Sequence, residues 1–216
     1  MNNRTVAAFQ RIYASHEWRG GSLSGPGSDP ERTLEFRNFL EEFIEEKRIR
    51  SIVDFGCGDW AYARLVNWGL ARYTGIDLVE SVIERNRCLY GSDKVSFMLR
   101  TSADTPLPPA DLFIAKEVLQ HLPSAEILSI LSLASNYPYC IFVNDIAHER
   151  RAGWQRGWRW VQPSEMNVDI NPGAHRLLSL REPPFVLQAR RALTYENRYR
   201  NLRWTKEVLV AEHGVR

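Results

Sequence analysis

The chain has 216 residues, of which 44% are hydrophobic and 25% are charged, and its formal net charge is +2. This composition excludes a disordered chain, and the length suits one α/β domain with a full core. The balanced charge gives no general reason to expect nucleic acid or a membrane as a partner, and no apolar run approaches the ~20 residues of a membrane helix. Three widely spaced cysteines predict reduced thiols in a cytoplasmic protein rather than a disulfide framework or a zinc site.

The first fifty residues predict two helices around a glycine-rich break. Apolar residues at helical spacing cover 5–18, and a second helix is expected from a cap at Ser28 or Asp29 to about Arg48. Between these helices, residues 20–28 are rich in glycine and serine and interrupt all regular structure. Taken alone, this stretch has the composition of a flexible linker.

From residue 51 onwards, short apolar runs alternate with helical patterns. Strands are expected at 51–55, 73–77, 95–99, 112–115 and 139–143, and helices at 61–68, 79–90 and 124–134. Such an alternation predicts buried parallel strands that right-handed crossovers join into one open sheet. Residues 147–180 look irregular, whereas 185–193 and 202–212 predict two strands that pair as an antiparallel edge.

A glycine loop follows the first of these strands. Residues 54–60 read Asp-Phe-Gly-Cys-Gly-Asp-Trp, and in an open α/β sheet this position faces the ligand crevice. The two glycines allow tight backbone angles and close approach of a ligand. The loop alone does not define the ligand, because it also fits the relaxed dinucleotide pattern GxGxxA. Three further candidate ligand-binding segments lie at the ends of the next strands, in chain order: Asp77, residues 102–104 and residues 111–122.

Together with the glycine loop, these segments resemble those of class I S-adenosylmethionine-dependent methyltransferases. The resemblance runs from about Ile52 to Asp145 and rests on residues 53–58 (VDFGCG), 73–77 (YTGID) and 111–121 (DLFIAKEVLQH). Less specific similarity of the flanks to a subgroup of bacterial methyltransferases extends it over most of the chain. The resemblance implies a Rossmann-like α/β fold, with a mostly parallel sheet, an antiparallel edge strand and helices on both faces.

The same resemblance implies one methyltransferase domain over residues 1–216. Within it, residues 1–50 would form a cap of helices whose glycine-rich stretch covers the cofactor, and residues 51–145 the cofactor-binding core. Residues 146–184 would form a lid on the substrate side, and residues 185–216 the C-terminal strands.

The cofactor implied by the resemblance is S-adenosyl-L-methionine, with S-adenosyl-L-homocysteine as product. Asp54 looks like the acid that holds the amino end of the methionine, and Asp77 like the acid that binds the ribose. Leu78 resembles the apolar residue beside the adenine, and Lys116 the residue that faces the sulfonium. The family often has an acid near the adenine amino group; here either Ser102 or Asp104 is expected there. The expected cofactor-binding residues are Asp54, Gly56, Gly58, Asp59, Trp60, Asp77, Leu78, Ser102, Ala103, Asp104 and Lys116.

Methyl transfer from a sulfonium is an in-line displacement, in which the protein aligns the nucleophile and removes its proton. His121 is the first candidate for the base because imidazole titrates near neutral pH, but it also suits a brace that bonds the backbone of its turn. Asp145 is the second candidate, as a base or as the residue that orients His121. No metal site is expected, because Asp145, Asn144 and Glu117 are scattered candidates, and Glu117 alternatively pairs with Lys116.

Residues 147–180 hold further polar and aromatic candidates. His148 and His175 suit either substrate contacts or solvated loop positions. Trp154, Trp158 and Trp160 stand among arginines, which is typical of an aromatic lid with a cationic rim. The alternative is that these tryptophans fill the core between lid and sheet.

The predicted function is methylation of a small molecule or a sugar, at oxygen. An RNA or protein methyltransferase is the main alternative, since the arginine–tryptophan segment offers stacking and phosphate contacts. The near-neutral charge and the lack of an Asn/Asp-Pro-Pro-Tyr/Phe motif after the fourth strand argue against it. Two other classes remain: an NAD-dependent oxidoreductase, against which Asp54 and the 116–121 turn speak, and a binding module without catalysis.

Overall fold

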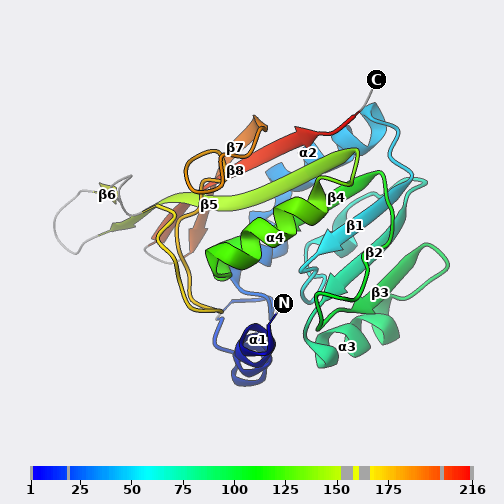
Figure 1. Cartoon of the computed structure of the whole chain (residues 1–216), viewed down its shortest axis with the longest axis horizontal. Helices are drawn as coiled ribbons and strands as arrows, with labels where there is room; N and C mark the ends of the chain where they lie inside the picture. The colour runs from blue at the N-terminus through cyan, green and yellow to red at the C-terminus, as the bar shows by residue number, and fades with distance from the viewer. Residues whose placement is uncertain (1, 19, 152–157, 161–165, 200–201, 215–216) are drawn as a thin grey trace.

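The computed structural model describes residues 2–18, 20–151, 158–160, 166–199 and 202–214. One sheet with strand order β3-β2-β1-β4-β5-β8-β7 forms its centre, and β6 pairs with β5 outside that order (Figure 1). The strands are β1 (Ser51–Phe55), β2 (Arg72–Asp77), β3 (Val95–Leu99), β4 (Leu112–Lys116), β5 (Tyr139–Arg151), β6 (Trp158–Trp160), β7 (Arg190–Tyr199) and β8 (Leu202–Glu212).

The first five strands are parallel and the last two are antiparallel to them or to each other. β1 pairs with β2 and β4, β2 with β3, and β4 with β5, all in parallel. β8 lies antiparallel between β5 and β7. The predicted Rossmann-like sheet with an antiparallel edge is therefore confirmed. Its order reverses at β1, so the carboxyl ends of β1 and β4 open a crevice at the switch point.

Helices cover both faces of the sheet, as expected. The long helices are α1 (Asn3–Ser15), α2 (Leu34–Glu46), α3 (Glu80–Tyr90) and α4 (Ser124–Ala134). Side chains alternate between the faces: Val53 and Phe55 belong to the core under α1 and α4, whereas Ile52 belongs to the core under α2. In Figure 1, α4 lies in front of the sheet and α2 behind it. Both layers are closely packed, and each buried Leu, Ile or Phe contributes about 1.5–3 kcal/mol to them.

The helix expected at 61–68 is wrong. Only a short 3-10 turn, η3 (Ala63–Leu65), forms there. Trp60 before it has a left-handed backbone (φ 59°), and Val66 after it is extended. Tyr62, Ala63 and Val66 are buried against the α2 layer, and their spacing of one and three residues imitated a helix in the sequence.

The second helix begins later than predicted. Two 3-10 turns, η1 (Pro26–Ser28) and η2 (Pro30–Arg32), precede α2, whose N-cap is Thr33. Asp29 does not cap the helix with its side chain, because its carboxylate accepts hydrogen bonds from Ser22 N and Arg32. The glycine-rich stretch is thereby tied to the start of α2 and is ordered as a folded loop.

The C-terminal half contains two further corrections. The irregular segment expected from 147 is in part regular, because β5 continues to Arg151 and pairs with β6 and β8. The strand expected from Phe185 begins only at Arg190, because the amides of Phe185 and Val186 both turn back to Glu182 O and Val186 has a φ of 48°. Trp154 lies outside the described residues. None of the helices in the described ranges is long and apolar enough to cross a membrane.

Candidate functional site

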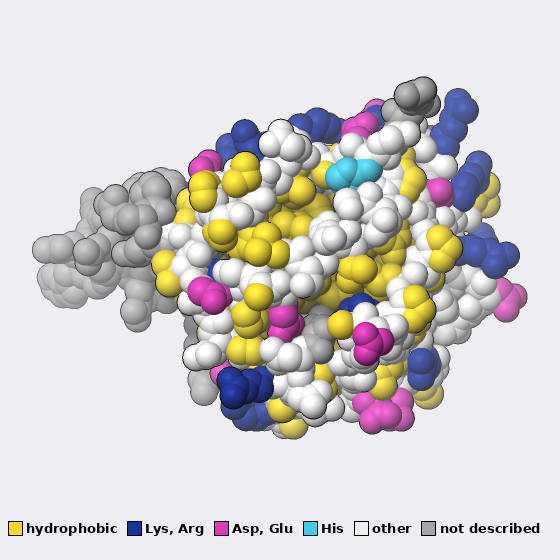
Figure 2. Space-filling view, viewed as in Figure 1, with side chains coloured by type: hydrophobic (Ala, Val, Ile, Leu, Met, Phe, Trp, Pro, Cys, Tyr) yellow, Lys and Arg dark blue, Asp and Glu magenta, His cyan; other side chains and the backbone are white. Residues whose placement is uncertain are grey.

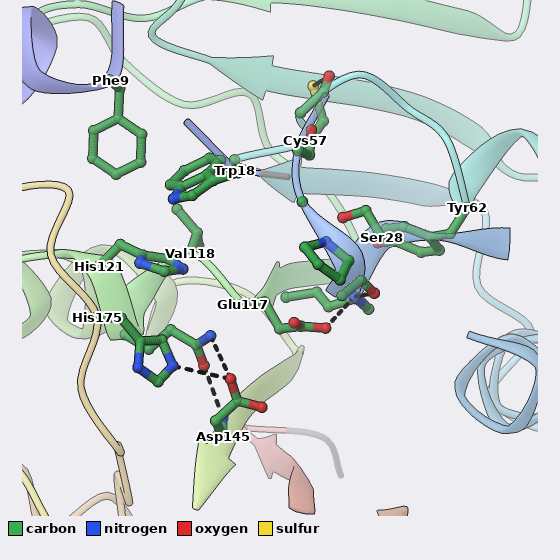
Figure 3. A pocket seen from close by; sticks show the side chains of 18 of the residues that line it. Phe9, Trp18, Ser28, Cys57, Tyr62, Glu117, Val118, His121, Asp145 and His175 are labelled. Atoms are coloured by element: carbon green, nitrogen blue, oxygen red, sulfur yellow. Dashed lines mark hydrogen bonds and ion pairs between the residues drawn. The ribbon is translucent and has the colours of Figure 1, made fainter. Parts of the chain in front are cut away.

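A cavity of about 370 Å³ opens at the carboxyl ends of β1, β2 and β4. Its walls come from the glycine loop after β1, from α1 and the glycine-rich loop, from the 116–121 turn, and from β7 and β8. Figure 3 shows Trp18, Val118 and His121 on one side of this cavity and Ser28 and Tyr62 on another. The cavity therefore lies at the switch point that the strand order defines.

Both glycines of the loop are required by their surroundings. Gly56 has a φ of 76°, and a Cβ there would lie 2.6 Å from Val118 Cγ2. Gly58 has a φ of 56°, and a Cβ there would lie 2.2 Å from Ser24 Oγ. Left-handed backbone and these short distances exclude any larger residue. The pair forms a narrow backbone cradle on the cavity wall, which fits a ligand that approaches the main chain.

Asp77 lies at the end of β2 on the wall of the cavity. Its Oδ1 accepts from Leu78 N at 2.8 Å and from Val79 N at 3.0 Å, and its Oδ2 accepts from Gly58 N at 3.0 Å. Burial raises the pKa of Asp77, and these three amide donors oppose that rise. Leu78 also lines the cavity. The two residues predicted to contact ribose and adenine thus stand together beside the glycine cradle.

Asp54 is fully buried but does not line the cavity. Its carboxylate accepts hydrogen bonds from Tyr73 Oη at 2.6 Å and from Tyr62 Oη at 3.5 Å. Burial raises the pKa of Asp54 to about 6, although Tyr73 and Lys116 lower it. Tyr62 lines the cavity, so Asp54 contacts the cavity wall only indirectly, through its hydrogen bond with Tyr62.

Asp59 holds the glycine-rich loop in place. Its carboxylate accepts from Ser22 Oγ at 2.8 Å and from Leu23 N at 2.7 Å. Its backbone N–H donates to Ser24 Oγ at 2.8 Å, and this hydroxyl also bonds Tyr13 Oη. As a result, residues 25–28 line the cavity. The stretch that had the composition of a linker is a wall of the site.

Besides Asp54 and Asp59, four more of the predicted cofactor residues do not line the cavity. Trp60 is buried against Tyr73, Tyr90 and Phe97 and supports the glycine loop from behind. Ser102, Ala103 and Asp104 form a turn in which Ser102 Oγ bonds the carboxylate and backbone N–H of Asp104. Arg100, which sequence reasoning missed, does line the cavity and donates to the carbonyls of Ala103 and Thr105.

A buried ionic network borders the cavity at the ends of β4, β5 and β8. Lys116 Nζ donates to Gly27 O at 2.9 Å and to Glu117 Oε1. Lys206 Nζ lies 2.7 Å from Glu117 Oε2 and 2.6 Å from Asp145 Oδ1. The predicted pairing of Glu117 with Lys116 is confirmed. Lys206 was missed, because the residues around it (Arg203, Thr205 and Glu207 among them) do not mark a buried charge in the sequence.

The charged groups of this network shift one another's pKa values. Burial lowers the pKa of Lys116. Burial alone would also lower the pKa of Lys206, but Asp145 and Glu117 raise it. Against burial, Lys206 and His175 hold the pKa of Asp145 well below its usual range. Two buried lysines, Lys116 and Lys206, therefore contact two buried carboxylates, Glu117 and Asp145.

Asp145 has no free carboxylate oxygen. Its Oδ2 accepts from His175 Nε2 at 3.1 Å (Figure 3) and from Gln120 Nε2 at 2.9 Å, while Oδ1 accepts from Lys206 Nζ. Gln120 Oε1 in turn accepts from Asp145 N at 2.7 Å. Asp145 is consequently a fixed carboxylate that orients His175, which lines the cavity.

His121 lies in the turn η4 (Leu119–His121) and lines the cavity. Its Nδ1 is 2.9 Å from Ala174 O, and since a carbonyl only accepts, Nδ1 carries the proton and Nε2 the lone pair. Burial and then His175 lower the pKa of His121 to about 4. The imidazole is neutral at physiological pH. The backbone bond that a brace requires is present, and it leaves Nε2 able to accept a proton.

Four rings connect the N-terminal segment to the last strand along the cavity. Trp18 and His121 have ring centroids 5.0 Å apart, His121 and His175 5.5 Å, and His175 and Trp204 4.9 Å. Trp18 and Trp204 were not identified from the sequence. Neither has a motif around it; only the fold brings them together.

Several sequence-based candidates cannot be placed or do not cluster. Trp154 lies outside the described residues, and β6 gives only the backbone of Trp158 and Trp160. Asn144 is buried beside Asp145 but does not line the cavity. In the parts of the chain that are described, no three His, Cys, Asp or Glu side chains converge as metal ligands.

Comparison with known families identifies the central part of the chain. A family model described as a methyltransferase domain matches residues 53–131, which span the glycine loop, Asp77 and the 116–121 turn. No curated protein matches.

The fold is shared with solved structures of low sequence identity. Magnesium protoporphyrin IX methyltransferase (ChlM) from Synechocystis PCC 6803 with bound SAM is 15% identical, with 99% of this chain and 93% of that chain covered and a TM-score of 0.54. TehB from Haemophilus influenzae is 13% identical, with 82% and 62% covered and a TM-score of 0.54. The methyltransferase domain of bacterial CtHen1-CN is 16% identical at a TM-score of 0.45. Its alignment takes in 51% of this chain, which spans just under two thirds (65%) of that one.

Proposed function

We propose that this chain, whose residues 53–131 match a methyltransferase-domain family model, is a class I S-adenosylmethionine-dependent methyltransferase that methylates an oxygen atom of a small molecule or sugar in the cavity described above. When bound, the cofactor supplies a methyl group on a sulfonium, which is already electrophilic. The protein has to hold the two reactants in line and to receive one proton.

The cofactor fits the residues at the switch point. Gly56 and Gly58, where any Cβ would collide with Val118 or Ser24, put backbone on the cavity wall, and Asp77 and Leu78 line the cavity too. In this proposal Asp77 binds the ribose hydroxyls, Leu78 contacts the adenine and Lys116 stands near the sulfonium. Asp54 contributes through Tyr62, and Asp59 and Trp60 support the loop from outside the cavity.

The observation that carries the catalytic proposal is the hydrogen bond from His121 Nδ1 to Ala174 O. It fixes the neutral tautomer whose Nε2 accepts a proton, and this ring lies on the cavity wall. We assign His121 as the general base. Asp145, both of whose carboxylate oxygens are engaged, is a positioning residue that orients His175 and Lys206.

A small acceptor suits the site better than a polymer. The glycine-rich loop, α1 and β7–β8 enclose a cavity of about 370 Å³ together with the glycine cradle. Small-molecule sites typically have about 300–1,000 Å³. On the face shown in Figure 2, Lys and Arg side chains stand among Asp and Glu side chains and form no basic stripe. An RNA-binding surface needs such a stripe.

The same geometry supports the expected organisation of the domain. We propose residues 1–50 as a cap, because residues 25–28 line the cavity, and residues 146–184 as a lid, because His175 lines it too. Three unpaired cysteines, Cys57, Cys88 and Cys140, support a reducing, cytoplasmic location.

The proposal is tested by methyl transfer from radiolabelled cofactor to a panel of hydroxylated small molecules, sugars, carboxylic acids and RNA. His121→Gln is expected to lower kcat by about 10²–10⁴-fold while the affinity for S-adenosylhomocysteine is retained. Glu84→Gln, exposed on α3 and outside the cavity wall, is the control. Full turnover of His121→Gln, or transfer to RNA alone, would overturn the proposal.

A further inference from the structure

The hairpin of β7 and β8 supplies a part of the cavity wall that lies outside the methyltransferase core motifs. Its lining residues are Asn197, Tyr199, Leu202, Trp204 and Lys206, and Arg32 faces them from the cap. The cofactor residues come from β1, β2 and β4 instead. This hairpin wall is therefore the candidate contact for the acceptor.

Asn197 has an unmet hydrogen-bonding requirement. The residue is only 3% exposed, and its Oδ1 is buried without a hydrogen-bond partner among the described residues. An unpaired buried acceptor costs about 1–3 kcal/mol. Because Asn197 lines the cavity, a donor group on a bound molecule is the direct way to meet that requirement.

Three polar side chains near this wall, Glu117, Asp145 and Gln120, are already paired. Glu117 binds Lys116 with one oxygen and Lys206 with the other. Asp145 is bonded through both oxygens, and Gln120 uses both its amide oxygen and its amide nitrogen on Asp145. A sugar would bring several hydroxyl groups into a wall with few open partners, and each unpaired one is unfavourable. An acceptor with one or two polar groups matches the wall better.

The charges along the wall are also compensated. Lys206 stands between Glu117 and Asp145, and Arg32 pairs with Asp29. Each of these two cations on or facing the hairpin wall therefore already has a carboxylate partner. The chemistry of the wall thus favours an uncharged ligand.

Aromatic side chains make up the rest of the wall. Trp204 packs against His175 with ring centroids 4.9 Å apart, and the guanidinium of Arg32 lies 5.1 Å above the ring of Tyr199. Leu202, the first residue of β8, adds an apolar side chain to the wall. Flat rings pack well against such a surface, by offset stacking or edge contacts.

We propose that the acceptor is an uncharged phenol that carries a second hydrogen-bond donor on its ring and donates it to Asn197 Oδ1. This inference rests on the proposed function and specifies its acceptor. The phenolic oxygen forms a bond to the methyl carbon while the carbon–sulfur bond breaks, and its electron pair stays on sulfur. The phenolic proton goes to His121 Nε2.

The basicity of His121 agrees with this choice. A histidine whose pKa is lowered to about 4 is a weak base. It is better matched to a phenol, with a pKa of about 10, than to the far less acidic hydroxyl of a sugar.

The test compares catechol, phenol and methyl glucoside as acceptors, using tritiated methyl donor, and measures kcat/KM for each. We expect transfer to catechol to exceed transfer to phenol by about tenfold, the value of one hydrogen bond, and no transfer to methyl glucoside. Asn197→Leu should bring catechol down to the level of phenol, whereas Asn197→Asp should keep the preference. Glu196→Gln, exposed on the other face of β7, should change nothing.

Failure of this inference differs from failure of the proposed function. Binding of S-adenosylhomocysteine is measured for every variant, so an unfolded variant is recognised, and the comparison of acceptors on the unaltered protein needs no variant. Transfer to methyl glucoside but not to phenols would overturn the phenol assignment and leave oxygen methylation standing. An unchanged catechol preference in folded Asn197→Leu, or cofactor binding with no phenol methylated, would also overturn it.

Discussion

Lys206 on β8 and Asp145 on β5 are register partners across the antiparallel edge, and Lys206 Nζ lies 2.6 Å from Asp145 Oδ1. Both side chains are buried, and the same ammonium contacts Glu117 Oε2 at 2.7 Å. One lysine therefore compensates two carboxylates at the edge of the cavity. This pair attaches the C-terminal hairpin to the cofactor-binding core.

Removing that lysine should destabilise the protein strongly. Lys206→Met leaves Asp145 and Glu117 as buried carboxylates with too little positive charge, and the expected loss in the free energy of unfolding is about 3–5 kcal/mol. Arg190→Met is the matched control in the same sheet, since Arg190 forms an exposed pair with Glu212, and it should cost no more than about 1 kcal/mol. Urea unfolding measures both. Equal losses in the two variants would show that the buried network is not what fixes the hairpin.

The glycine-rich loop should be sensitive to a single methyl group. A Cβ on Gly27 would lie 1.8 Å from Glu117 Oε2, so Gly27→Ala prevents the loop from lying on the ionic network. We expect the affinity for S-adenosylhomocysteine to fall by at least about tenfold, measured by calorimetry.

Gly69→Ala serves as the control for Gly27→Ala. Gly69 has a φ of 58° and no atom within 4 Å of the added Cβ. It should lose about 1 kcal/mol of stability and keep its cofactor affinity. If Gly27→Ala binds like the unaltered protein, the loop does not form part of the cofactor site.

Two carboxylates predicted from the sequence to bind the cofactor should differ in importance. Asp77 lines the cavity beside the glycine cradle, whereas Asp104 is exposed and stands away from it. Asp77→Asn should weaken S-adenosylhomocysteine binding by about 10–100-fold, the value of a hydrogen bond to a charged group. Asp104→Asn should change it less than about twofold. A comparable loss in both variants would place the adenine against residues 102–104, as the sequence resemblance implies.

His121 should make stability depend on pH in a defined window. Its pKa is about 4 in the folded protein and 6.5 when unperturbed, so between these values the unfolded chain binds more protons and the folded protein loses stability as the pH falls. Above pH 6.5 His121 is neutral in both states, and the protein keeps its full free energy of unfolding. His121→Gln lacks this titration. From pH 7 to pH 5, the unaltered protein should therefore lose about 1–2 kcal/mol more of its free energy of unfolding than the variant loses. A difference that is the same at both pH values would contradict the lowered pKa.

The parallel core could be predicted from the sequence because its signals are local. The strand 51–55 and the helix 124–134 are confirmed at both ends, since apolar runs and helical spacing reflect burial directly. The helix predicted over residues 61–68 was wrong for the same reason. Tyr62, Ala63 and Val66 are buried there, but Trp60 has a left-handed backbone and only the short 3-10 turn Ala63–Leu65 forms after it.

The site was predictable only where a motif carries it. The glycines and Asp77 lie on the cavity wall as expected, because their spacing follows the ends of β1 and β2. Asn197 and Lys206 could not be found this way. Their positions depend on the antiparallel register of β7 and β8 with β5, which joins residues about sixty positions apart and has no sequence signature.

The central claim is that the cavity at the glycine loop binds the sulfonium cofactor and its product. Titration calorimetry of the purified protein with S-adenosylhomocysteine and, separately, with NAD tests it most directly. The structure predicts saturable one-to-one binding of S-adenosylhomocysteine, weakened by Asp77→Asn, and no heat of binding with NAD. Binding of NAD without binding of S-adenosylhomocysteine would contradict it.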